Sequence, residues 1–225
     1  MTDPVPVWAR PERGARGPAP ERSRAQITEA AVAIADADGL AAVSMRQVAR
    51  SLGTGPASLY RYVSGRDDLV DLMADAVAGE IDLAPMPGGD WAGDMVALAS
   101  AGKAVHLRHP WLLDVPPQPA RVGPRAIDYL EHALHLLEPA PADGRTKLEV
   151  IGVVNGLVAQ FARNEIAARD AAAERQAAQA AYLAQVAAEG RHPRLAAAMA
   201  DTAPHEDAQI LFERTIRRVV TGLIA

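Results

Sequence analysis

Apolar residues recur at helical spacing through most of the chain, and this pattern constrains the fold more than any other feature. From Ser23 onward they stand three and four residues apart, and no segment shows the strict alternation of a half-buried strand. Helices are expected over residues 23–39, 44–52, 57–63, 64–77, 91–109, 124–137, 145–168, 167–188 and 206–224. The pattern therefore predicts an all-α protein.

Composition excludes several classes of protein. With 49% hydrophobic and 23% charged residues, the 225-residue chain resembles a soluble globular protein. No apolar run approaches the roughly 20 residues of a membrane span, and the N-terminus lacks the apolar core of a signal peptide, so we expect a cytoplasmic protein without a membrane partner. The absence of cysteine excludes disulfides, thiolate metal sites and cysteine nucleophiles.

The sequence also lacks the motifs of common enzymes. It contains no P-loop, dinucleotide-binding glycine pattern or nucleophile elbow. Glu131, His132 and His135 are in the wrong order for the zinc-binding HExxH motif, and His106 and His109 suit a helix end better than a metal site. We expect no catalytic residues, no cofactor, no metal and no enzymatic activity.

Basic and acidic residues are distributed unequally along the chain. Residues 1–66 hold nine Arg and six acidic residues, whereas residues 67–225 hold 14 basic and 22 acidic residues. Residues 1–21 alternate proline and glycine with arginine, which predicts a disordered basic arm. A basic N-terminal part is compatible with binding to an anionic polymer.

Residues 44–63 have the organisation of a helix-turn-helix unit, in which the second helix enters the major groove of DNA. Ser44 is placed to cap the first helix, with Gln47 three residues later, and Gly53 begins the turn. The next helix begins with small residues that allow close approach to DNA and continues with side chains that can reach phosphates and base edges. These are Gly55, Pro56, Ala57, Ser58, Tyr60, Arg61 and Tyr62.

The block from Arg24 to Val77 resembles the DNA-binding domain of the TetR family of bacterial transcriptional regulators. The matching residues include Ser44–Ala49, Leu52–Gly53, Leu59–Val63, Arg66 and Leu69. The resemblance implies an all-helical homodimer with a three-helix DNA-binding head and a larger domain for ligand binding and dimerisation. We accordingly expect an arm at residues 1–21, a DNA-binding domain at 22–66 and a ligand-binding and dimerisation domain at 67–225.

The resemblance also assigns roles within the head. Ser44 and Met45 match positions beside the DNA backbone, and Arg46 matches a position that can reach a base edge. Tyr60, Tyr62 and Arg66 match positions that contact phosphate, with arginine at 66 replacing the usual lysine. Direct base readout is expected to depend on Arg46, Ser58 and Arg61, because amide side chains are scarce in the second helix.

A dimer is expected because one short recognition helix reads too few base pairs for useful specificity. The best interface candidates lie in residues 145–165 and 206–224, the latter with Phe212, Ile216, Val219, Val220 and Leu223, although these stripes can also face the core of one subunit. A largely apolar effector is expected between the helices of the second domain. The residues proposed to line its site, each of which can alternatively fill the core, are Trp91, Met95, His106, Trp111, Leu112, Tyr129, Asn155 and Phe161.

The predicted function is a ligand-responsive transcriptional regulator that binds a palindromic operator in double-stranded DNA as a dimer. Release of DNA by a small molecule favours a repressor. The sequence does not exclude an activator. The alternative is a helical protein-interaction module without sequence-specific DNA binding. Salt-sensitive binding to duplex DNA distinguishes the two functions.

Overall fold

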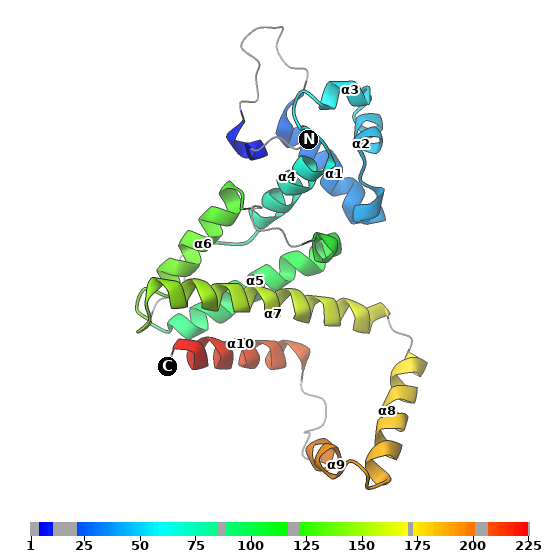
Figure 1. Ribbon diagram of the computed structural model, residues 1–225, viewed down its shortest axis with the longest axis vertical. Coiled ribbons are helices and arrows are strands. Elements are labelled where there is room, and N and C mark those ends of the chain that lie inside the picture. The colour runs from blue at the N-terminus through cyan, green and yellow to red at the C-terminus, as the bar shows by residue number, and fades with distance from the viewer. Residues whose placement is uncertain are drawn as a thin grey trace.

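The computed structural model describes residues 5–10, 22–84, 89–116, 122–170, 173–200 and 207–224, and these ranges contain helices and no strand. The all-α prediction is confirmed. The described helices form a head, a body and a projecting helical pair (Figure 1). None of the described helices combines the length and apolar character needed to cross a membrane.

The head contains the N-terminal helices. Its elements are the short helix η1 (Val7–Ala9), α1 (Arg24–Asp38), η2 (Leu40–Ala42), α2 (Met45–Ser51), α3 (Pro56–Leu59) and α4 (Arg66–Ala78). Ser23 starts α1 with a complete capping box, in which its hydroxyl accepts from the Gln26 N–H and its own N–H donates to the Gln26 side chain. Gly39, at φ +79°, ends α1 in a conformation that favours glycine.

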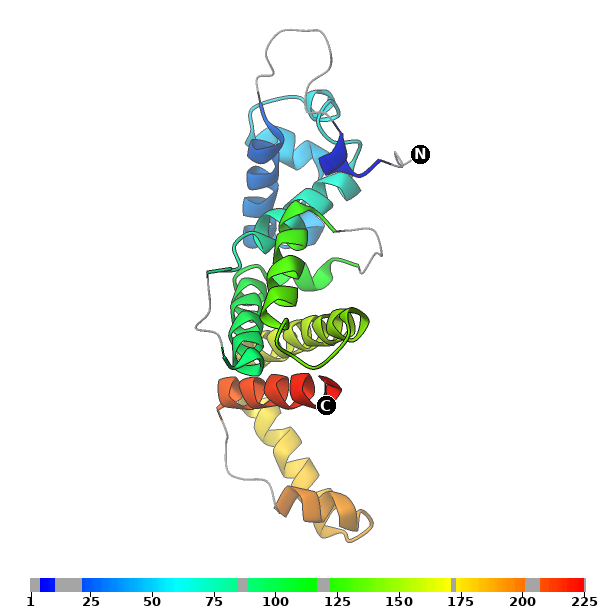
Figure 2. The same cartoon turned by 90° about the vertical axis from the view of Figure 1, so that its left-hand side faces the viewer.

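The body contains α5 (Trp91–Arg108), η3 (Pro110–Asp114), α6 (Pro124–Leu136), the long α7 (Gly144–Asp170) and α10 (Ala208–Ile224). Helices α5, α7 and α10 pack against one another, and α6 covers one end of this group (Figures 1 and 2). Their shared core includes fully buried Met95, Ile151 and Phe212. The body therefore has a hydrophobic cluster of its own, while Val105 of α5 and Trp111 of η3 belong to the core of the head.

Helix α4 packs in the head, so the structural head extends beyond the boundary predicted at residue 66. Its buried side chains Leu69, Val70, Met73 and Val77 all join the core of the head. The apolar stripe of α4 was identified from sequence, but helical spacing does not indicate which domain covers the stripe. The structural head therefore continues to the end of α4.

The structure also corrects part of the prediction of a disordered N-terminal arm. Residues 5–10 form η1 and its flanks, and Val7 is 1% exposed in the core of the head. The remainder of the arm, residues 1–4 and 11–21, lies outside the described residues. Burial of an apolar side chain accounts for the docking of this proline-rich segment.

Helices α8 (Ala173–Ala188) and α9 (Pro193–Ala200) pack against each other and project from the body (Figures 1 and 2). Helical spacing did not predict α9, because a proline commonly ends a helix. Pro193 instead occupies the first position of α9, where its missing N–H removes no helical hydrogen bond.

Candidate nucleic-acid interface

Helices α2 and α3 lie at the end of the molecule opposite α8 and α9 (Figure 1). The Ser44 hydroxyl caps α2 by accepting from the Gln47 N–H at 3.2 Å. The turn between the helices uses Gly53 at φ +66°, and the Thr54 N–H closes it by donating to the Ala49 carbonyl at 2.9 Å. Pro56 then starts α3. The predicted helix-turn-helix geometry is therefore present, although α3 is shorter than expected.

Three side chains of this unit extend into solvent and are available to a ligand. Arg46, Tyr60 and Arg61 are exposed, with Tyr60 at 56%. Within the described ranges, no protein hydrogen bond or ion pair engages their side chains. Two unpaired guanidinium groups and a phenol on one end of the molecule can bind phosphates and base edges.

The small residues at the start of α3 leave its backbone accessible. Gly55, Pro56 and Ala57 are exposed. The Ser58 hydroxyl donates to the Gly55 carbonyl at 2.7 Å and also lies 2.9 Å from the Thr54 hydroxyl. Ser58 therefore stabilises the turn, and a base contact from Ser58 would share its hydroxyl with these partners.

Two residues expected to contact DNA are mainly core residues. Met45 is 9% exposed and Tyr62 is 6% exposed, and both pack in the hydrophobic core of the head. Tyr62 can offer DNA little beyond its hydroxyl group, whereas Met45 positions α2 by packing. Both side chains are turned inward because the head is small and covers its aromatic and apolar groups.

Arg66 has a structural role that the sequence did not indicate. Its Nε donates to the Val43 carbonyl at 3.0 Å and its Nη2 donates to the Leu40 carbonyl at 2.8 Å. Arg66 thus connects the start of α4 to the segment before α2. These two bonds orient the guanidinium toward the protein backbone, which weakens the expectation that Arg66 is chiefly a phosphate contact.

Arg10 and Asp68 form a second support for the interface. The Arg10 guanidinium contacts the Asp68 carboxylate at 2.6 and 3.0 Å, and it also donates to the Ser64 hydroxyl. Arg24 donates to the Arg10 carbonyl and to the Tyr62 carbonyl. Although burial raises the pKa of Asp68, the bonds from Arg10 and Ser64 outweigh this effect and hold the pKa below its usual value. The docked N-terminal segment thereby fixes the corner between α3 and α4.

The proposed effector residues do not form one group. Trp111 is 2% exposed in the core of the head, whereas Met95 is fully buried in the core of the body. Phe161 packs edge-on against Phe212, with ring centroids 5.2 Å apart. Trp91 and Leu112 are half-buried, and His106 Nδ1 lies 3.0 Å from the Gly102 carbonyl oxygen.

Tyr129 and Asn155 are brought together as a polar pair between α6 and α7. The Tyr129 hydroxyl donates to Asn155 Oδ1 at 2.6 Å, and burial raises the pKa of Tyr129 to about 12. Asn155 itself is exposed rather than buried. His132 on α6 has a buried Nε2 without a partner among the described residues. His132 lies one helical turn from Tyr129, so α6 carries two polar groups on one side.

The predicted dimer residues are mostly core residues of one subunit. Phe212, Ile216 and Val220 are fully buried between α10, α5 and α7. Val219 is half-buried and Leu223 is 47% exposed. The apolar stripe of α10 was identified correctly, but the subunit covers most of that stripe itself.

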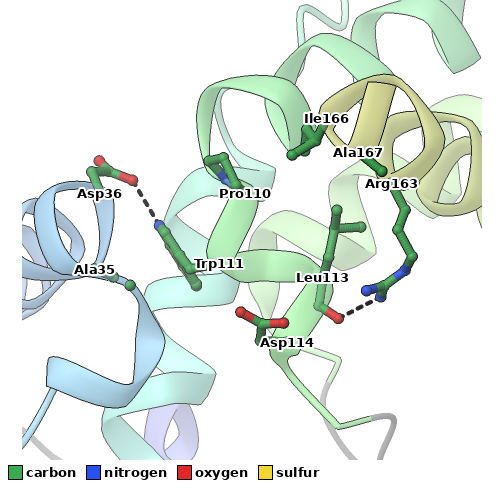
Figure 3. A pocket seen from close by; sticks show the side chains of 10 residues that line it. Ala35, Asp36, Pro110, Trp111, Leu113, Asp114, Arg163, Ile166 and Ala167 are labelled. Carbon is green, nitrogen blue, oxygen red and sulfur yellow. Dashed lines mark hydrogen bonds between the residues drawn. The ribbon is translucent and has the colours of Figure 1, made fainter. Parts of the chain in front are cut away.

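A polar bridge joins the head to the body. His109, only 4% exposed, lies 2.7 Å from Asp36 Oδ1 through Nδ1 and 3.1 Å from Glu80 Oε2 through Nε2. The Trp111 indole also donates to Asp36 Oδ1 at 2.7 Å (Figure 3). Burial raises the pKa of Glu80, but its bonds with His109 and Arg108 hold the pKa below the usual value. This polar bridge of Asp36, Glu80, His109 and Trp111 connects the ends of α1, α4 and α5.

Comparison with known proteins identifies similar chains. Residues 27–73 match the family described as "Bacterial regulatory proteins, tetR family", and residues 84–225 match "Tetracyclin repressor-like, C-terminal domain". The chain is 38% identical over 204 residues to the HTH-type transcriptional repressor DrrR1 of Streptomyces coeruleorubidus, covering 87% of this chain and 76% of that protein. It is 32% identical over 224 residues to an HTH-type transcriptional regulator of Saccharopolyspora erythraea, covering 99% and 92% of the two chains.

A solved structure has a similar fold. The crystal structure of the TetR family protein ActR of Streptomyces coelicolor in complex with actinorhodin aligns with a TM-score of 0.75 at 27% identity. The alignment covers 90% of this chain and 96% of the ActR chain. The similarity therefore includes both the head and the body.

Proposed function

The chain belongs to the TetR family of bacterial regulatory proteins, and on this premise we propose that it is a ligand-responsive, dimeric transcriptional repressor. It binds duplex DNA through α2 and α3, and a small molecule in the body changes its affinity for DNA. The observation that carries the proposal is the exposed, unpaired set of Arg46, Tyr60 and Arg61 on a helix-turn-helix unit with a rigid core.

The arrangement of the head supports DNA binding. Packing of Val48 and Leu59, both fully buried, fixes α2 relative to α3. The capped turn adds hydrogen bonds that hold the recognition helix in one orientation. A helix that enters the major groove needs this rigidity, because each base contact depends on side-chain position.

Exposed residues on α7 and α10 support a homodimer. Helix α7 presents Leu148 at 51% and Val153 at 45% exposure beside exposed Gly152 and Gly156, which allow close helix packing. Helix α10 presents Leu211 and Leu223 at 39% and 47%. We propose that these faces pair with a second copy of the chain, replacing the buried positions favoured from sequence.

The body is the proposed site of an effector with a largely apolar surface. The ActR structure aligns with both the head and the body of this chain. ActR was crystallised with actinorhodin, which is a precedent for a ligand in a related regulator. Tyr129, Asn155 and His132 supply donors and acceptors near a core of aliphatic and aromatic side chains. A few polar groups in an apolar site orient a ligand.

Selection of bound duplexes from a random DNA pool tests the function. The purified full chain should enrich a palindrome, and affinity for it should fall steeply between low and physiological salt as phosphate counterions are released. Arg46→Ala should reduce enrichment, whereas Asp128→Asn, which changes an exposed α6 residue, should not. Absence of enrichment at both salt concentrations would favour a helical protein-interaction module.

A further inference from the structure

A cleft lies where the head meets the body. Its walls are the end of α1, helix η3 and the C-terminal part of α7, and its volume is about 420 Å³ (Figure 3). This volume falls within the range of small-molecule sites. The cleft is separate from the α6–α7 polar groups proposed for the effector, because neither Tyr129, His132 nor Asn155 lines it.

The cleft combines an apolar surface with two carboxylates, of which Asp36 is already bonded to His109 and Trp111 through Oδ1. Trp111, Leu113 and Ile166 supply apolar contacts, and Asp36 and Asp114 supply the carboxylates. Within the described part of the chain, no hydrogen bond reaches Asp36 Oδ2 or either carboxylate oxygen of Asp114. Arg163, the cationic residue of the lining, donates instead to the Leu113 carbonyl at 2.7 Å.

We propose that this cleft binds an amphipathic organic cation, a molecule with a flat apolar body and a protonated amine. The amine is placed against the exposed Asp114 carboxylate, and the apolar body contacts Leu113 and Ile166 beside Trp111. A carboxylate beside an apolar wall favours such a ligand over a neutral analogue of the same shape, because the analogue leaves the charge unpaired.

Binding in the cleft would act on the head directly. Asp36 belongs to α1, whereas Asp114 and Ile166 belong to the body, so one ligand contacts both parts. Asp36 Oδ1 also accepts from His109 and Trp111, and a cation in the cleft therefore weakens the attraction of this carboxylate for the polar bridge. A ligand that prefers one head orientation shifts the protein toward it. Cation binding rests on the cleft alone, whereas its effect on DNA affinity rests on the proposed function.

Fluorine NMR of the full chain provides the test. The chain contains three tryptophans, at positions 8, 91 and 111, so 5-fluorotryptophan labelling gives few signals, and Trp111→Phe assigns the one in the cleft. The probes are 2-(2-naphthyl)ethylamine and the neutral 2-(2-naphthyl)ethanol. The amine should shift the Trp111 signal saturably, and the alcohol should bind at least about tenfold more weakly, a difference of about 1.4 kcal/mol.

Two variants locate the amine. Asp114→Asn should weaken amine binding at least about fivefold without loss of fold, because Asp114 is exposed and bonds to no described side chain. Asp128→Asn, a charge removal on exposed α6, should bind the amine as the parent does. No saturable shift, equal binding of amine and alcohol, or unchanged binding by Asp114→Asn would overturn the proposal.

The regulatory consequence is measured separately. With the selected duplex, the amine should lower DNA affinity of the parent protein and have a smaller effect on Asp114→Asn. Cation binding without any DNA binding would leave the cleft in place and contradict the proposed function. DNA binding that the amine leaves unchanged at saturation would overturn the coupling between cleft and head.

Discussion

At the scale of single residues, the head separates arginines that face solvent from those that hold its backbone. Arg46 is exposed without a protein partner among the described residues, whereas Arg66 donates to two backbone carbonyls. The resemblance to a family assigned both to DNA. The structure distinguishes them by what each guanidinium contacts.

We expect Arg46→Ala to lower operator affinity by about 1–3 kcal/mol and to relax specificity at one base position. Arg66→Ala should instead lower the free energy of unfolding by about 1–2 kcal/mol, because two partly buried carbonyls lose a charged donor. Urea unfolding and binding to matched and mismatched duplexes measure both effects. Equal stability of Arg66→Ala and the parent would contradict the structural role.

The lowered pKa of Asp68 predicts acid release of the N-terminal segment. A carboxylate with a lowered pKa in the folded protein stabilises it above the usual value of 3.8, and this contribution disappears as pH falls through the folded-state pKa. Emission from Trp8, which packs beside the head, should change in that acidic range before global unfolding when it is measured with Trp91 and Trp111 replaced by Phe. Asp68→Asn should show, already at neutral pH, the emission that the parent shows only after acid release of the segment. Emission equal to that of the parent at neutral pH would contradict the prediction.

At the scale of elements, α4 caps the start of α6. Asp75 Oδ1 accepts the N–H groups of Arg125 and Ala126 at 3.0 and 3.1 Å, in place of a cap from Gly123, which has no side chain. Burial raises the pKa of Asp75 despite these bonds. A head helix and a body helix are therefore joined by one carboxylate.

Gly123→Ala should displace this cap, because an added Cβ would lie 2.3 Å from the Asp75 carboxylate. We expect a loss of about 1 kcal/mol, seen as a lower thermal midpoint. Gly144→Ala is the matched control, since a Cβ there meets nothing within 4 Å. Similar midpoints for the two variants would show that Asp75 does not hold α6.

At the scale of the whole molecule, the proposed assembly depends on the exposed face of α7. Val153→Glu should shift the protein from dimer to monomer, because it places a charge in an apolar helix pair. Ile127→Glu, at a 55% exposed position on α6, should leave the dimer intact. Sedimentation of both variants at several concentrations measures the assembly, and circular dichroism checks the fold. A dimeric Val153→Glu would exclude this face as the interface.

The sequence by itself determined the helices and the helix-turn-helix unit. Helical period, the Ser44 cap and the turn at Gly53 act over a few neighbouring residues, and they are readable without tertiary contacts. The same patterns identified the apolar stripes of α4 and α10. They did not predict α9. A proline can end the helix before it or occupy the first position of the helix after it, and Pro193 does the latter.

Only the tertiary structure decided which partner covers each stripe. It placed α4 in the head, buried Tyr62 and Phe212 within one subunit, and left Asn155 exposed. It also joined Asp36 to His109 across 73 positions, a contact that no local spacing encodes. The physical reason is that periodicity specifies a face of a helix, whereas burial and hydrogen bonding depend on the elements that the whole fold brings against that face.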